Sequence, residues 1–194
     1  GVREVLSGLA NHHHAAQIVM GRGRRDYGFD AHKPADPAED SRKVTVMSTT
    51  PAAVKEASAP LLAIAEGVFF TRDLVNEPAN HLTTTEFANR LEDMQNIGLI
   101  VGVLEEDKLE ELGMGSLLSV GQGSDSPSKV VVMKWMGGEE DDAPLALVGK
   151  GVVFDTGGIS LKPAAGMEDM TMDMGGAGVV SGTMRSLALR KAKA

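Results

Sequence analysis

The sequence predicts an α/β fold with a mostly parallel sheet and helical cover. Two apolar runs rich in valine, residues 130–135 and 145–154, are bounded by Gly, Pro or Asp. Such runs are typical of strands that are buried on both faces of a parallel sheet. Elsewhere apolar residues recur at helical intervals, and strands that alternate with helices indicate a sheet covered by helices.

The first half of the chain is expected to be mainly helical. Apolar residues at helical spacing predict helices over residues 14–25 and 52–73. The polar, proline-containing stretch at 28–42 has the composition of a loop or linker. Residues 44–47 are predicted to form a short strand.

The second half carries clearer boundary signals. Thr83 and Glu86 have the spacing of a capping box and predict that a helix begins there. A strand is expected over residues 99–104, and a charged helix over residues 107–112 is expected to be closed by Gly113.

The last expected element is a helix that begins near Met174. It reaches Ala194 with no cap or turn signal, as if the chain were cut inside the helix. The elements together divide the chain into a leading piece (residues 1–50), a linker helix (51–74) and an α/β domain (75–194).

Composition excludes several classes of site. The chain has 194 residues, 42% of them hydrophobic, and a formal net charge of −8, which counts against a nucleic-acid surface. It contains no cysteine, so disulfides, thiolate metal sites and a thiol nucleophile are excluded. No apolar run approaches the roughly 18 residues that span a bilayer, and residues 1–9 do not resemble a signal peptide. A cytoplasmic protein is the expectation, with no membrane partner.

The residues with potential catalytic or ligand-binding side chains lie in and just after the second valine-rich run. That run ends in Asp155, and Gly157 and Gly158 follow, which allow a sharp turn and the close approach of a ligand. Lys150 and Asp155 have opposite parity, so an ideal strand would point them to opposite faces and a bulge near Gly149 or Gly151 would be needed to join them. Taken singly, an acid at a strand end is most often a turn or cap residue.

The combination of motifs resembles the M17 leucyl aminopeptidase (cytosol aminopeptidase) family. Residues 148–163 read VGKGVVFDTGGISLKP and residues 173–177 read DMGGA, both in the spacing of that family. A looser similarity extends over residues 72–80, which read RDLVNEPAN. The resemblance implies an incomplete phosphorylase/hydrolase-like catalytic domain over residues 75–194, preceded by the end of a smaller α/β N-terminal domain over residues 1–50.

The resemblance also implies a role for each matching residue. Asp155 would bridge two divalent metal ions, and Lys150 and Asp173 would complete the ligand shell of the more exchangeable ion. Lys162 would be the catalytic lysine that polarises the scissile carbonyl, and Met170 would line the substrate pocket. The ions would be Mn²⁺ or Zn²⁺, with Mg²⁺ as a further possibility.

The family resemblance implies an activity, and it also implies that the 194 residues lack part of the active site. It implies a homo-hexameric metallo-aminopeptidase that releases N-terminal residues, preferably leucine, from peptides with a free N-terminus. The family's second motif, NTDAEGR, which supplies further ligands, does not occur in the 194 residues. The isolated fragment is therefore expected to be inactive. The alternatives are a DNA-binding transcriptional regulator of the same family and a catalytically inactive structural subunit.

Two histidine features are expected to have no special role. Three consecutive histidines, His12 to His14, would point about 100° apart on a helix and cannot converge on one ion. They are expected to lie at the surface. His81 is expected in a loop before the helix that Thr83 caps.

Overall fold

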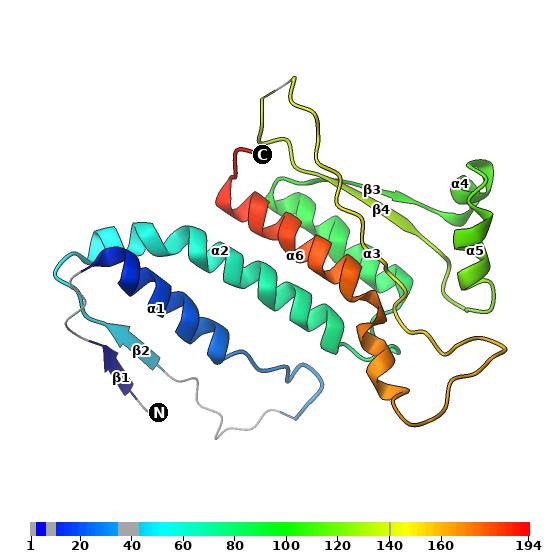
Figure 1. The fold of residues 1–194 in the computed structure, drawn as a ribbon, viewed down its shortest axis with the longest axis horizontal. Helices are drawn as coiled ribbons and strands as arrows, with labels where there is room; N and C mark the ends of the chain where they lie inside the picture. The colour runs from blue at the N-terminus through cyan, green and yellow to red at the C-terminus, as the bar shows by residue number, and fades with distance from the viewer. Residues whose placement is uncertain (1–2, 7–10, 35–42, 140) are drawn as a thin grey trace.

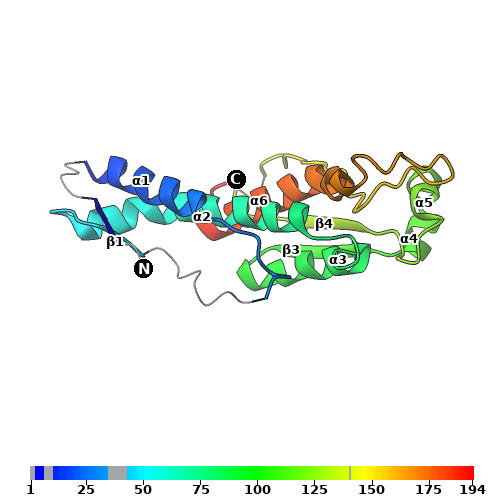
Figure 2. The same ribbon diagram turned by 90° about the horizontal axis from the view of Figure 1, so that it is seen from below.

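A computed structural model describes residues 3–6, 11–34, 43–139 and 141–194 (Figure 1). The molecule is elongated, with β1, β2 and α1 at one end and α4 and α5 at the other (Figure 2). Residues 35–42, the end of the predicted linker, lie outside the described residues. Residues 28–34 contain no helix or strand, as the sequence predicts.

The N-terminal end pairs two short strands beside a helix. Strands β1 (Arg3–Leu6) and β2 (Lys43–Val46) are parallel, with Arg3 opposite Lys43. Helix α1 (His12–Arg25) is capped by Asn11, whose side chain accepts a hydrogen bond from the His13 amide at 2.8 Å. The predicted helix and strand of this region are confirmed to within two residues.

Two helices, far apart in the sequence, form the spine of the molecule. Helix α2 (Pro51–Asn76) packs along α6 (Gly175–Arg190), as both views show. The backbones approach closely at Gly67 and Gly182: a Cβ atom added to Gly67 would lie 2.2 Å from the Gly182 carbonyl oxygen. Thr71 Oγ1 also donates to the Gly178 carbonyl at 2.9 Å. The predicted linker helix thus packs directly against the last helix.

The region after α2 follows its sequence signals. The Thr83 hydroxyl accepts the Glu86 amide at 3.1 Å and caps α3 (Thr84–Glu92), which continues as the 3₁₀ helix η1 (Asp93–Ile97). The Glu86 side chain accepts a hydrogen bond from Arg90 Nε at 2.7 Å. Of the two hydrogen bonds of a capping box, only the one to the Thr83 hydroxyl is therefore present. Next come β3 (Ile100–Leu104), α4 (Glu106–Glu111), α5 (Gly115–Gly121) and β4 (Val130–Lys134).

The hydrophobic core lies where α2, α3 and α6 meet strands β3 and β4. Its fully or nearly buried members are Leu74, Leu82, Phe87, Leu91, Met94, Leu99, Met174 and Ala188. Residues of both strands and Val153 pack against its edge. Met174, the last residue of the 3₁₀ helix η2 (Glu168–Met174), is fully buried, so η2 is anchored to the core, and with it the backbone of Asp173.

The prediction of a mostly parallel sheet is wrong for the central strands. β3 and β4 form a two-stranded antiparallel sheet, with Ile100 opposite Lys134 and Leu104 opposite Val130. Apolar strand composition does not encode direction, and the connection through the short helices α4 and α5 returns the chain beside β3. The fold is α/β in content, with two separate two-stranded sheets among the described residues.

The predicted strand at 145–154 does not form. Leu145 and Val148 are 86% and 94% exposed, and the segment joins no ladder among the described residues. A strand requires a neighbour that pairs with its N–H and C=O groups, and none lies beside it in the described chain. The valine-rich composition therefore suits a buried strand, but no neighbouring strand pairs with this segment in the described chain.

The expectation that the last helix runs to Ala194 is also wrong. α6 ends at Arg190, and Lys191 adopts the left-handed conformation (φ 51°) that closes many helices. The Trp135 indole N–H donates to the Ala192 carbonyl at 2.8 Å, and the Gly137 amide donates to the Ala194 carbonyl at 3.2 Å. These tertiary contacts hold the terminal residues against the end of β4.

Candidate functional site

The segment that carries the predicted site runs against the first turn of α6. The Ala177 amide donates to the Lys150 carbonyl at 2.9 Å. A Cβ atom on Gly149 would lie 2.5 Å from the Gly176 carbonyl oxygen, so this close contact requires glycine at position 149. The two motifs of the sequence are thereby brought side by side, and Lys150 is placed next to Asp173.

Lys150 and Asp173 form an ion pair. Lys150 Nζ lies 2.7 Å from Asp173 Oδ1, with the lysine side chain 56% exposed and the aspartate 20% exposed. The other aspartate oxygen, Oδ2, is buried and accepts no hydrogen bond in the described part of the chain. A buried acceptor without a donor is uncommon and marks a place where a further positive group can bind.

Asp155 and Lys162 form a second ion pair across a tight turn. Lys162 Nζ lies 2.8 Å from Asp155 Oδ2, and the Gly157 amide donates to Asp155 Oδ1 at 2.9 Å. The turn needs glycine because Gly157 and Gly158 have φ values of 91° and 65°. The hydrogen bond from Lys162, then that from the Gly157 amide, hold the pKa of Asp155 below its usual value, and the charges of Lys162 and Lys150 add to this.

Met170 lies beside the second pair. It belongs to η2, and Lys162 Nζ donates to its sulfur at 3.1 Å. The structure therefore gathers Asp155, Lys162 and Met170 in one group and Lys150 with Asp173 in another. The charge of Lys150 contributes least to the lowered pKa of Asp155, and no direct contact joins the two groups among the described residues. No bulge is needed, because the segment is not a strand.

These side chains fit a divalent ion as ligands. Two carboxylates from different segments, Asp155 and Asp173, are each paired with a lysine, and Oδ2 of Asp173 is buried without a donor among the described residues. Carboxylate oxygens suit Mn²⁺, Mg²⁺ and Zn²⁺. In this arrangement the two lysine ammonium groups balance the carboxylate charges, which is what a bound ion would otherwise do.

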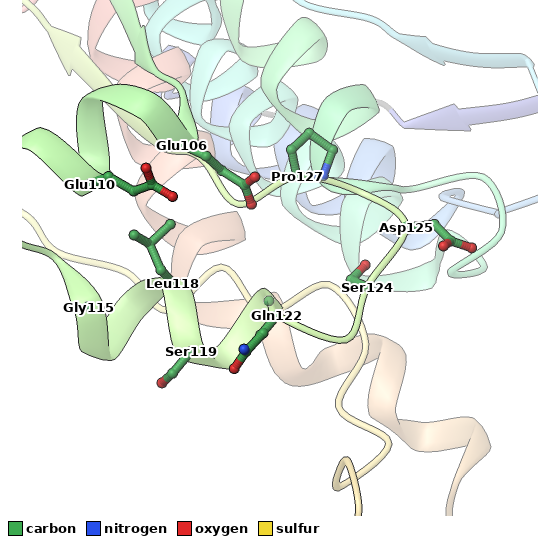
Figure 3. Close-up of a pocket in the computed structure, with 10 residues that line it drawn as sticks. Glu106, Glu110, Gly115, Leu118, Ser119, Gln122, Ser124, Asp125 and Pro127 are labelled. Carbon is green, nitrogen blue, oxygen red and sulfur yellow. The ribbon is translucent and has the colours of Figure 1, made fainter.

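A pocket elsewhere holds none of the five predicted residues. It lies between α4 and α5, and its lining includes Glu106, Glu110, Leu118, Gln122 and Ser124 (Figure 3). Glu106 already accepts the Ser128 amide at 2.7 Å. This pocket is unrelated to the motifs.

Sequence reasoning missed one cluster, made by His32, Glu77 and His81. His81 was expected to be only a loop residue, and His32 carried no signal because it lies 45 residues before Glu77. The histidines at the start of α1 are half-buried or exposed, as expected. No helix in the described residues is both long and apolar enough to cross a membrane.

Comparison with known proteins agrees with the motifs. The model of the cytosol aminopeptidase family, catalytic domain, matches residues 69–194. A probable cytosol aminopeptidase of Dinoroseobacter shibae is 67% identical over 180 residues, which cover 92% of this chain and 36% of the relative. One of Cereibacter sphaeroides is 61% identical over 93% of this chain and 37% of the relative. The chain thus spans little more than a third of these relatives.

Solved structures show the same similarity in three dimensions. The cytosol aminopeptidase of Coxiella burnetii superposes with a TM-score of 0.79 at 26% identity, covering 98% of this chain and 40% of that one. The bottromycin maturation enzyme BotP in complex with Mn superposes with a TM-score of 0.73 at 35% identity, covering 90% and 36%. With sequence motifs, family match and backbone in agreement, the chain belongs to the cytosol aminopeptidase family.

Proposed function

We propose that the protein that carries this chain is a metal-dependent aminopeptidase that releases N-terminal residues, preferably leucine, from peptides with a free N-terminus. The observation that carries the proposal is the buried, unsatisfied Oδ2 of Asp173 beside Lys150, with the Asp155 carboxylate on the neighbouring turn. The names of the relatives support the reaction, and the Mn complex of BotP supports a divalent ion.

Lys150, Asp155 and Asp173 are the proposed ligands on this chain. Asp155 would be shared by two ions, and Lys150 and Asp173 would hold one of them. When bound, the ions supply an activated water and a site for the substrate's amino group. The ions are proposed to be Mn²⁺ or Zn²⁺, with Mg²⁺ able to replace them.

Lys150 must be neutral to act as a ligand. Nearby dications would supply the free energy that the loss of its proton costs. Without an ion, its ammonium group donates to Asp173 instead. Lys150 and Asp173, which pair with each other here, would instead hold the ion when it is bound.

Lys162 has the opposite requirement, because its proposed role needs a positive charge. Its positive charge is proposed to stabilise the oxyanion that develops on the scissile carbonyl. Its contact with Met170 places the ammonium group beside a flexible thioether, which is proposed to line the pocket for the N-terminal side chain. An apolar wall of this kind favours Leu or Met side chains over charged ones.

The 194 residues do not supply a complete ligand set. The NTDAEGR motif is absent from them, and three ligands cannot close a two-ion site. We propose that this chain alone hydrolyses nothing, that residues 75–194 are part of the catalytic domain, and that the longer protein is a cytoplasmic homo-hexamer. Neither the described residues nor the names of these relatives support the DNA-binding alternative.

The test uses the longer protein with Mn²⁺ and a leucine amide. Lys162→Ala is expected to lower kcat by about 10²–10³-fold, because an oxyanion partner is removed. Asp155→Ala is expected to abolish both turnover and metal uptake. Lys55→Ala, an exposed lysine on α2, is the matched control. Normal turnover in both site variants would overturn the proposal. A folded, metal-loaded wild type without any peptidase activity would point to the inactive structural subunit.

A further inference from the structure

Three side chains from separate segments meet at the end of α2. His32 comes from the loop after α1, Glu77 is the C-cap residue of α2, and His81 lies in the turn before α3. One potential ligand atom from each lies within 4.8 Å of the other two. None of the three belongs to the site proposed above.

Glu77 is the buried centre of this cluster. It is only 5% exposed, yet it carries a carboxylate. Oε1 contacts His32 Nε2, and Oε2 accepts a hydrogen bond from Arg90 Nη1 at 2.8 Å. Burial raises the pKa of Glu77, but the hydrogen bonds from His32 and Arg90 outweigh it and keep the pKa below its ordinary value. The carboxylate therefore stays ionised and faces His32 with one oxygen.

Arg90 orients this carboxylate without cancelling the local negative charge. Its Nε binds Glu86 Oε1 at 2.7 Å while its Nη1 binds Glu77. Two carboxylates thus share one guanidinium, which leaves a net charge of −1 when the histidines are neutral. Ligating carboxylates in metal sites are commonly held by such an outer partner on the second oxygen.

The two histidines are arranged side by side at the surface. Their rings stack with centroids 4.0 Å apart and planes 24° apart, and Phe29 meets His32 edge-on at 5.8 Å. Both side chains are exposed, so an ion can enter from solvent. The turn that carries His81 is fixed by the His81 amide, which donates to the Pro78 carbonyl at 2.9 Å.

We propose that His32, Glu77 and His81 bind a Zn²⁺ ion. Two imidazole nitrogens and one carboxylate oxygen form a donor set that Zn²⁺ takes, with water in the fourth position. Imidazole ligands favour this class of ion over Mg²⁺ or Ca²⁺. The three donor atoms lie within 4.8 Å of one another, and they would adjust their spacing to form bonds of about 2.0–2.2 Å to one ion. The ion would fasten the loop after α1 to the turn that leads into α3.

A purely structural network is the competing explanation. Glu77 could serve only to join Arg90 and His32, as the hydrogen bonds show. That explanation gives no part to His81, whose ring has no hydrogen-bond partner in the described chain and only stacks on His32. His81 is therefore the residue whose replacement separates the two explanations.

The test measures Zn²⁺ binding to the full chain by titration calorimetry and elemental analysis. To remove binding at the proposed peptidase ligands, the reference protein carries Asp155→Ala and Asp173→Ala. In this background one equivalent of Zn²⁺ is expected to bind and to be lost in His81→Ala and in His32→Ala. His13→Ala, an exposed histidine on α1, is the control and is expected to keep the equivalent.

Imidazole NMR resonances supply a second readout. Zn²⁺ is expected to shift the ring signals of His32 and His81 and to leave those of His13 and His14 unchanged. Circular dichroism verifies that each variant is folded. Undiminished Zn²⁺ binding in folded His81→Ala, or ring signals of His32 and His81 that do not respond to Zn²⁺, would overturn the proposal. Neither readout depends on peptidase activity, so a negative result for the Zn²⁺ site would leave the proposed aminopeptidase function untouched, and the reverse also holds.

Discussion

The α2–α6 helix pair and the segment at 145–166 illustrate two kinds of order in one chain. The helices satisfy their own backbone hydrogen bonds and pack closely against each other at Gly67 and Gly182. The segment carries most of the site residues, yet Val148, Ile159 and Leu161 are strongly exposed. Helices need only a packing surface, whereas an extended segment needs a neighbouring strand for its N–H and C=O groups.

Amide hydrogen exchange should show the largest difference between the two regions. In the 194-residue chain, amides in the middle of α2 are expected to exchange at least about a thousand-fold more slowly than those at 145–154, which corresponds to ~4 kcal/mol in opening free energy. Mass spectrometry after timed deuterium labelling measures this. Equal protection would contradict the comparison. Strong protection of 145–154 in the longer protein alone would show that another strand pairs with it there.

The glycine contact should dominate the stability of the helix pair. Gly67→Ala is expected to lower the free energy of unfolding by about 2–3 kcal/mol, because the new methyl group would overlap the Gly182 backbone. Gly21→Ala on α1 is the control: no atom lies within 4 Å of its added Cβ, so a gain of about 0.5–1 kcal/mol is expected. Urea denaturation measures both, and similar values would refute the close packing.

A single hydrogen bond between the helices should have a smaller effect. Thr71→Val removes the donor to the Gly178 carbonyl and is expected to cost about 1 kcal/mol. Thr183→Val is the matched control, since its hydroxyl bonds only to Val179 of the same helix. It is expected to change stability by less than about 0.5 kcal/mol. If Thr183→Val costs as much as Thr71→Val, the interhelical bond does not stabilise the pair.

The smallest effect on stability is expected at the site itself. Lys162→Ala should alter the free energy of unfolding by no more than about 0.5 kcal/mol, because its ion pair with Asp155 is partly exposed and therefore screened by solvent. The same substitution is expected to be severe for turnover in the longer protein. Thermal denaturation of the chain tests the stability part, and a large loss would mean that the turn at Gly157 and Gly158 depends on this pair.

Local patterns were reliable wherever the decisive interactions are local. Helix α3 begins where Thr83 predicts, and α6 begins one residue after Met174. Local patterns did not predict strand direction, because valine-rich runs occur in both parallel and antiparallel sheets. The end of α6 also escaped prediction, since Trp135 and Gly137 bind the residues that follow it. The domain boundaries near residues 50 and 75 stay predictions.

The sequence alone determined the family and the five candidate site residues, because the motifs at 148–163 and 173–177 keep residue type and spacing together. Tertiary structure decided which of them meet: Gly149 against the first turn of α6 pairs Lys150 with Asp173. It also placed His32 beside Glu77, which lies 45 residues later in the sequence, and beside His81. Such contacts depend on how helices pack, and packing depends on shape and volume along whole elements rather than on any local spacing.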